Sequence, residues 1–547
     1  MNENRLTEKQ LAGLPNLLTR IVRYGVYFVL FTPLIVSSKF YFPFVGPKSI
    51  YFMALVEIVF FAWLILAIFY KEYRPRKNLI FLALILFLAI LAISSVLGVN
   101  PSNSFWSKFE RMTGLLMWFH LFAFFLVTSS VFRKKDDWYK IFNISIFAGF
   151  LVSIFSLLDK AGVRTFHLSD GFGTTLGNSS FLGTYLLFNI FLIIYFLLEG
   201  KSKLKLFLVI ALVLMVLAIF FEGARAATIS LVGGMGLLAV LYFCFVPQEK
   251  WLRLLGKIAL LVSLVIFLVG IFFIFQKGNI IHEKFAEMIS QDRQIVWQIA
   301  WQGFKEKPLF GWGQENFELA FNQHFNPGLF TAGDIWFDRA HNVVYDILAA
   351  NGILGLLAYL GIFISVFYIL WKKYLSGKVN FWLTAIPSVL LVAYFVQNLT
   401  VFDMVSSYLM FFLILGFISG FVDGEKNEEK EDESKSTRTE EREDLPKKTL
   451  AIILALVFLV TFFEFIIQPA RTDYLAIKAL RVPHQERVKI YRETLNTSPV
   501  GKYQIREFFA DQSQVIIGAN IDKIPKETTK EELDFVVSEL EKTEKEV

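Results

Sequence analysis

Cysteine is almost absent from this chain of 547 residues, in which Cys244 is the only one. A single cysteine makes neither an internal disulfide bond nor a thiolate metal cluster, which excludes a disulfide-stabilised secreted protein. Charged residues are also few, at 19% of the chain, whereas soluble domains contain about 25%. The net charge of +6 is modest, and no compact basic domain points to nucleic acid. These shortages exclude a soluble enzyme and a disordered chain.

Apolar residues make up 55% of the chain, and the mean hydropathy is +0.54. They fall in blocks of roughly 20 residues, long enough to cross a bilayer core of about 30 Å. Thirteen such blocks are expected near residues 19–38, 49–70, 78–98, 112–132, 138–158, 179–198, 205–221, 225–246, 254–275, 343–371, 380–399, 404–422 and 449–467. The sequence therefore predicts an all-α, polytopic integral membrane protein with about 13 transmembrane helices.

Lysine and arginine gather in alternate loops between the predicted spans. The basic set comprises the N-terminal tail and the turns at 71–77, 133–140, 201–205, 250–257 and 372–378. The other loops hold far fewer positive charges, and positive loops stay on the cytoplasmic side. The N-terminus is therefore predicted to be cytoplasmic, and the long segment 276–342 to lie outside the cytoplasm.

Because successive spans end on alternate sides of the membrane, the chain is expected to divide into a core, a linker and a tail. We expect a transmembrane core over 1–422, a charged cytoplasmic linker over 423–448, a last span over 449–469 and an extracytoplasmic tail over 470–547. Apolar residues recur in the tail at helical spacing, at Tyr474, Ile477 and Leu480 and at Val488, Tyr491 and Leu495. This pattern predicts a small helical hairpin or a partial tetratricopeptide-like repeat. Since one such unit is marginally stable alone, we expect it to dock on the core or on a partner.

Two outer segments carry glycine or arginine in unusual settings. Gly171–Tyr185 is rich in glycine and hydroxyl groups, but it lacks the GxxxxGK[ST] pattern of a phosphate loop. Its glycines could let backbone N–H groups approach an anion, or serve turns and close helix packing. The turn Glu222-Gly-Ala-Arg225 fixes Arg225 at the outer interface. That arginine suits either a snorkelling anchor or a bidentate phosphate ligand.

The segment Ser290–Lys307 is amphipathic, and Pro308 ends it. Arg293, Trp297 and Trp301 recur four residues apart, so they share one helix face. Indoles on one side predict a helix that lies in the membrane surface and presents Arg293 at headgroup depth. A surface helix with one solvated arginine is the alternative.

His341 lies directly before the tenth predicted span, in the sequence Asp338-Arg-Ala-His-Asn. An imidazole near a helix N-terminus has a lowered pKa, which keeps it neutral and available as a general base. A structural role is the alternative, and Asp338 or Asp346 could orient the ring. The histidines are widely spaced and no Asp-x-Asp pattern occurs on this side, so no metal ligand set is predicted.

Four segments in this order resemble the O-antigen ligase and polymerase superfamily over roughly residues 80–420. They read LGNSSFLGTY, GAR, DRQIVWQIAWQGFKEKPLFGWGQENF and AHNVVYDILAANGILGLL. The tail resembles members that carry tetratricopeptide-like helices. The resemblance implies a GT-C-like transferase core in a bacterial cytoplasmic (inner) membrane. It also implies glycan transfer from a polyprenyl-diphosphate carrier to an acceptor on the outer side, without a metal ion or cofactor.

Carried onto this sequence, the resemblance makes His341 the general base and Arg225 and Arg293 the ligands of the donor diphosphate. Arg339 and Arg111 are possible helpers, and Asp338, Asn178 and Trp297 are supporting residues. The family often has Ser-Arg-Gly where this chain has Ala224-Arg225-Ala226, so the immediate neighbours match less well. The expected partners are the lipid-linked glycan donor, a glycan, lipid or protein acceptor, and the bilayer. An O-antigen polymerase, a protein O-oligosaccharyltransferase, a solute transporter and a non-catalytic scaffold remain as alternatives.

Overall fold

The computed structural model describes residues 3–163, 173–200, 204–274, 276, 279, 283, 289–424, 445–520 and 526–546. Helices are the only regular elements within these ranges. Much of the predicted linker, residues 425–444, lies outside them, as do Gly171 and Phe172 of the glycine-rich segment and part of the loop 276–342.

A helix coincides with every one of the thirteen predicted spans. These helices are α1 (Glu3–Val29), α2 (Gly46–Phe69), α3 (Leu79–Leu97), α5 (Leu115–Val131), α6 (Lys135–Lys160), α7 (Ser179–Glu199), α8 (Lys205–Phe221), α9 (Arg225–Phe245), α10 (Lys250–Ile274), α15 (Val343–Leu375), α16 (Phe381–Gln397), α17 (Val405–Phe417) and α19 (Leu445–Phe462). Within the described residues, eight helical stretches are long and apolar enough to cross a membrane, and three shorter helices are also apolar. The prediction of an all-α polytopic membrane protein is confirmed.

Two predicted spans have different ends in the structure. The first was expected to run to residue 38, but α1 ends at Val29 and a 3₁₀ turn follows over Thr32–Leu34. Pro33 accounts for this end, because its ring and missing N–H do not fit a helix interior. The last span continues beyond its expected end as one helical stretch, Thr449–Ala479, through a π turn at Phe463–Ile467.

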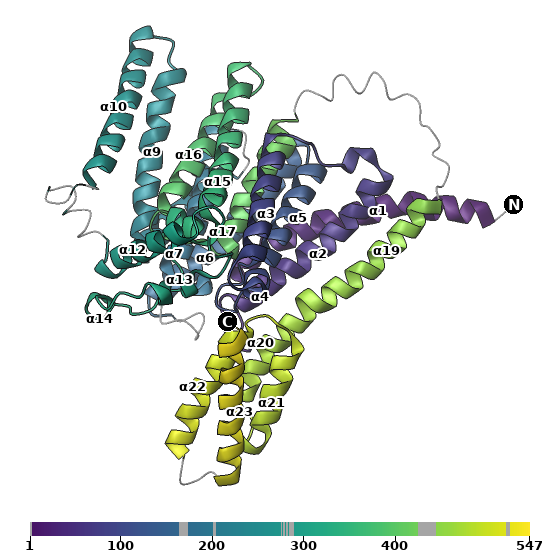
Figure 1. Ribbon diagram of the computed structural model, residues 1–547. Helices are drawn as coiled ribbons and strands as arrows, with labels where there is room; N and C mark the ends of the chain where they lie inside the picture. The colour runs from purple at the N-terminus through teal and green to yellow at the C-terminus, as the bar shows by residue number, and fades with distance from the viewer. Residues whose placement is uncertain are drawn as a thin grey trace.

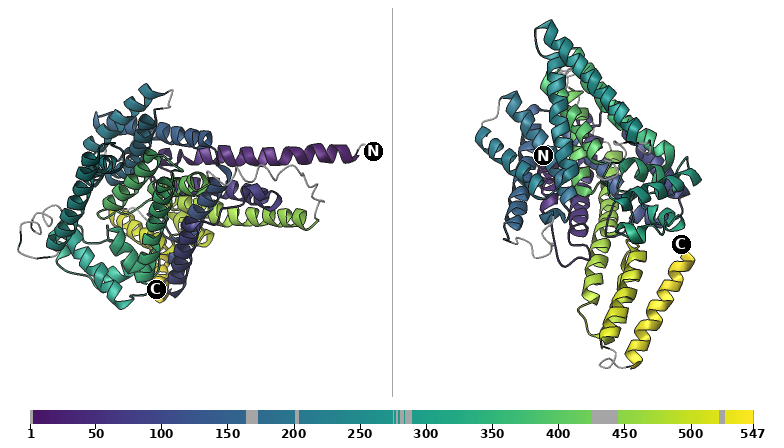
Figure 2. Two further views of the ribbon diagram at one scale, coloured as in Figure 1. Left: turned by 90° about the horizontal axis from the view of Figure 1, so that it is seen from above. Right: turned by 90° about the vertical axis from the view of Figure 1, so that its left-hand side faces the viewer.

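The bundle is centred on α7 and α17. Of their apolar windows, 83% and 94% are buried, which fits helices that are apolar on all sides. By contrast, only 6% of the window in Thr449–Ala479 is buried. Helices α1 and α19 extend from the same side of the bundle (Figure 2). Each packs on α2.

The short helices α4 (Pro101–Trp106), α12 (Gln291–Glu306), α13 (Phe317–Gln323) and α14 (Leu329–Ala332) gather at one end of the bundle, which we call the outer end after the orientation predicted from the loop charges (Figure 1). The tail helices α20 (Gln468–Ala479), α21 (His484–Thr497), α22 (Lys502–Asn520) and α23 (Lys526–Glu546) lie beside them. The basic turns after α9 and α15 lie at the opposite end. This arrangement agrees with the predicted grouping of loops.

A glycine break in α15 fixes α12 to the bundle. Gly352 has φ +67°, and its neighbours pair with the chain that follows α12: Ile353 N donates to Pro308 O at 2.8 Å, and Gly313 N donates to Ala350 O at 2.8 Å. A Cβ atom at Gly352 would collide with the backbone of Leu309, so only glycine fits this close approach. The break therefore holds α12 and the start of α15 in one frame.

Candidate functional site

An open cavity of about 300 Å³ lies at the outer end. Its lining includes four predicted site residues, namely Arg111, Asn178, Arg293 and His341. Backbone segments 42–45, 176–181 and 400–402 form much of the remaining surface. Residues from distant parts of the sequence thus share one cavity, and Arg225, Trp297, Asp338 and Arg339 are not part of its lining.

Arg293 enters the cavity from the first turn of α12. Its Nη1 donates to the carbonyl oxygen of Thr400 at 3.0 Å. Within the described part of the chain it makes no ion pair, although Asp292 and Asp334 lie near enough to favour its charge. Burial lowers its pKa below the ordinary arginine value. A half-buried guanidinium whose side chain meets only a carbonyl has donors left for an anion.

Trp297 lies one turn further along α12 and faces α15 rather than the cavity. Its Nε1 donates to Ala340 O at 2.9 Å, and its ring stacks on Tyr345 with the centroids 5.8 Å apart. Trp301 on the same face is 46% exposed. The predicted amphipathic helix is present, and its first indole fixes α12 against the segment that carries His341.

His341 is held by backbone and aromatic contacts. Its Nδ1 lies 3.2 Å from Arg339 O, and its ring meets Phe337 and Phe402 edge-on at centroid distances of 5.4 and 4.8 Å. A carbonyl only accepts, so this contact favours the proton on Nδ1 and leaves the Nε2 lone pair free. Burial, together with the charge of Arg293, lowers the pKa of His341 to about 4. The imidazole is therefore neutral at pH 7.

His341 also has φ +52°, a left-handed conformation that is uncommon outside glycine. The side chain of Asn342 caps α15 immediately afterwards by accepting from Val344 N at 3.0 Å. Its Nδ2 donates to Leu399 O at 2.8 Å. The cap and the strained residue together fix the direction in which the imidazole leaves the helix start.

Arg111 lines the cavity, but its charge is compensated by Asp338. It donates to Asp338 from Nε at 2.8 Å and from Nη2 at 2.9 Å, and Glu110 lies 3.0 Å away. Lys108 Nζ is a further 3.2 Å from Asp338. Burial raises the pKa of Asp338, but the charges of Arg111 and Lys108 outweigh it and hold that pKa well below its usual range. Asp338 thus compensates the positive charges of Arg111 and Lys108.

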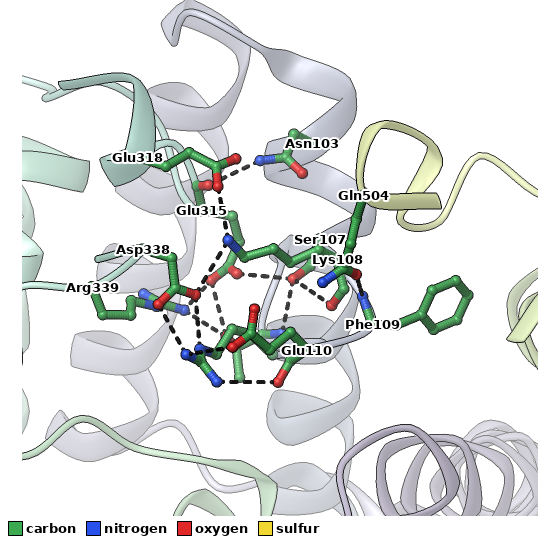
Figure 3. Close-up of polar contacts among 12 residues, drawn as sticks. Asn103, Ser107, Lys108, Phe109, Glu110, Glu315, Glu318, Asp338, Arg339 and Gln504 are labelled. Atoms are coloured by element: carbon green, nitrogen blue, oxygen red, sulfur yellow. Dashed lines mark hydrogen bonds and ion pairs between the residues drawn. The ribbon is translucent and has the colours of Figure 1, made fainter. Parts of the chain in front are cut away.

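Arg339 points away from the cavity into the protein. It is 9% exposed, pairs with the carboxylate of Glu315 and donates to Thr113 Oγ1 at 2.6 Å. Ser107 donates to the other oxygen of Glu315 at 2.8 Å. These contacts join the segments around 107–113, 315 and 339, so Arg339 supports the architecture of the outer end (Figure 3).

Arg225 is exposed at the first position of α9. Glu222 in the same turn is buried instead against Ser156, Gly173 and Lys160, at 2.7, 3.0 and 3.3 Å. Within the described ranges, the Arg225 guanidinium has no partner. A Cβ on Gly183 of α7 would lie 2.9 Å from the Cβ of Ala224, so Arg225 starts close to the α7 side of the cavity without lining it.

Asn178 lines the cavity and caps α7. Its side chain accepts from Ser180 N at 2.8 Å. Gly177 beside it has φ +68° and packs against Phe44. Buried Lys48 donates to Thr175 O and, at 2.7 Å, to Ile35 O, which ties the preceding turn to the 42–45 segment.

The sequence did not reveal the contributions of 42–45 and 400–402. These are short, largely apolar connections with no titratable group, so composition and motif carry no signal for them. Glu315 was also missed, since one carboxylate in a long outer loop is usually solvated. The available hint was that Glu315 lies among three aromatic residues and two glycines in the segment 310–317.

No group of three or more His, Cys, Asp or Glu side chains that could hold a metal ion occurs within the described residues. Comparison with known proteins gives one family: residues 210–360 match the family model described as O-Antigen ligase. The matched segment contains Arg225, Arg293 and His341. No curated protein matches the chain.

Proposed function

We propose a specific reaction for this chain, because its residues 210–360 match the O-antigen ligase family, in which glycan transfer of the ligase and polymerase type is the general activity. The protein transfers a glycan from a polyprenyl-diphosphate carrier to an acceptor hydroxyl on the outer side of the cytoplasmic membrane. The observation that carries this proposal is the cavity shared by the unpaired Arg293 and the neutral His341.

Arg293 and Arg225 are the proposed ligands of the donor diphosphate. Arg293 has free donors in the cavity, and Arg225 is exposed beside α7 with no carboxylate partner among the described residues. Guanidinium groups bind phosphate oxygens bidentately and stabilise charge that develops on a leaving group. The charge of Arg111 is compensated by Asp338, so its proposed contribution is to shape the cavity rather than to clamp the diphosphate.

His341 is the proposed general base. Nε2 takes the proton from the acceptor hydroxyl while that oxygen bonds to the anomeric carbon. The bond from this carbon to the diphosphate oxygen breaks at the same time, and the lipid diphosphate leaves with the electron pair. A direct displacement inverts the configuration at the anomeric carbon. The chain supplies no metal ligand set for this step within its described residues.

Three related acceptors fit the same site. A lipid acceptor makes the protein a ligase, a growing glycan a polymerase, and a protein hydroxyl a protein O-oligosaccharyltransferase. We favour ligation or protein glycosylation, because the tail contacts Tyr41, Ser107 and Phe109 next to the cavity lining and offers a surface for a second macromolecule.

The deciding experiment compares carrier-linked and acceptor-linked glycans in cells with and without the gene. We expect carrier-linked glycan to accumulate when the gene is deleted, and the missing conjugate identifies the acceptor. Unchanged carrier-linked glycan combined with lost uptake of a small solute would favour the transporter alternative instead.

A further inference from the structure

The C-terminal tail contacts the core at two places. The first is the loop that follows α4. Gly501 N donates to Ser107 O at 3.0 Å, and Phe109 N donates to Gln504 Oε1 at 2.9 Å (Figure 3). The side chain of Phe109 is completely buried. Gly501 has φ +60°, and a Cβ there would lie 2.7 Å from Phe109 Cδ2. The approach of tail and loop therefore depends on glycine at this position.

The second contact holds the segment before α2. Tyr41 N donates to Asp473 Oδ1 at 2.6 Å, and the rings of Tyr41 and Phe508 lie 4.1 Å apart between centroids. Asp473 belongs to α20 and Phe508 to α22. Two separate tail helices thus contact one short stretch of the core.

Both segments that the tail contacts continue directly into the lining of the cavity. Phe42–Val45 follows Tyr41 without a gap, and Glu110 and Arg111 follow Phe109. We call residues 41–46 and 107–111 the cavity wall. On its other side this wall is attached to the core through Asp338 and Glu315. The wall is therefore held between the core and the tail.

We propose that the tail is a positioning part of the transferase site, which fixes the cavity wall and thereby sets the affinity for the lipid-diphosphate donor. This inference rests on the proposed function. Without the tail contacts the cavity wall would be less ordered. The donor would then have to order the wall when it binds, and this entropic cost would weaken its affinity. We expect the effect on donor binding rather than on the general base, because the ring of His341 is held by Arg339 O, Phe337 and Phe402 and makes no direct contact with the wall among the described residues.

Two tail substitutions in the full-length protein test this. Gly501→Ala introduces a Cβ against Phe109, and its control is Gly377→Ala, where φ is +69° and nothing lies within 4 Å. Phe508→Ala removes the contact with Tyr41, and its control is Phe535→Ala, whose ring contacts Tyr491 within the tail. Hydrogen exchange at the backbone amides of 41–46 and 107–111 reports docking independently of activity.

We expect both test variants to exchange faster in the wall, to raise KM for the donor about tenfold and to change kcat by less than about twofold. Binding of geranylgeranyl diphosphate, used as a probe, should weaken by the same factor, and both controls should behave as wild type. Faster exchange with unchanged KM and probe affinity would overturn the inference, and so would unchanged exchange in both variants. A lower kcat at unchanged KM would indicate a merely structural tail. Wild-type protein that binds the probe but transfers no glycan would refute the proposed function instead.

Discussion

The guanidinium of Arg111 binds the carboxylate of Asp338 through two hydrogen bonds, at 2.8 and 2.9 Å. Arg293, on the same cavity, donates from its side chain to the carbonyl oxygen of Thr400 and makes no ion pair within the described part of the chain. Two arginines of one cavity therefore have different roles. The first is compensated by Asp338, and the second has no ion pair among the described residues, which supports its proposed role as a ligand of the donor diphosphate.

Asp338→Asn tests the first role. The change leaves Arg111 and Lys108 without their shared carboxylate, and breaking a buried ion pair costs roughly 3–5 kcal/mol of unfolding free energy. We expect a clear fall in the melting temperature of the detergent-solubilised protein. Asp334→Asn, at an exposed site, is the control. Equal melting temperatures for both variants would show that the pair contributes nothing.

His341→Ala tests the base. Loss of a positioned base should reduce turnover by about 10²–10⁴-fold, while the affinity for the donor stays near the wild-type value. Single-turnover transfer and donor binding measured on the same preparation separate the two effects. If the variant keeps near-normal rates, the general base is a group other than His341.

The pH dependence of kcat follows from the pKa of His341, which burial lowers to about 4 from an ordinary value of 6.5. The neutral imidazole is the active form, so activity should persist through pH 6 and be lost only as the pH falls through about 4. In Arg293→Gln the acid limb should move to higher pH, because the charge of Arg293 helps to lower this pKa. An acid limb near 6.5 in the wild type would contradict the buried geometry.

Arg293→Gln and Arg225→Gln test the diphosphate ligands. A hydrogen bond to a charged group contributes about 1.5–3 kcal/mol, so each change should weaken binding of the donor by about 10–100-fold. Isothermal titration with a polyprenyl diphosphate measures this directly. Arg481→Gln, at an exposed tail position, is the control. Unchanged affinity in Arg225→Gln alone would limit the site to Arg293.

Treatment with EDTA tests whether arginines replace a divalent cation. Purified protein supplied with lipid-linked glycan should transfer it at the same rate with and without the chelator. A loss of transfer that Mg²⁺ restores would refute the arginine-clamp mechanism.

The helical architecture was largely predictable from the sequence, because each membrane span must satisfy its own backbone hydrogen bonds and be apolar over a fixed length. The end of the first span was not, since Pro33 stops α1 within an apolar run. In the candidate site, Arg293, His341, Arg111 and Asn178 were expected and lie together on one cavity. The domain boundaries and the tetratricopeptide-like character of the tail stay predictions.

The partnership of each arginine was not predictable, because side-chain pairing depends on contacts between segments more than 200 residues apart, such as Arg111 with Asp338. The sequence by itself determined a polytopic all-helical chain and a match to the O-antigen ligase family model over residues 210–360. Only the tertiary structure decided that Glu222 turns away from Arg225, that Arg339 is buried on Glu315 and that the tail holds the cavity wall. The helices follow from the local pattern of apolar residues along the sequence. The compensation of a charge depends instead on which distant group the folded chain brings within a few ångströms.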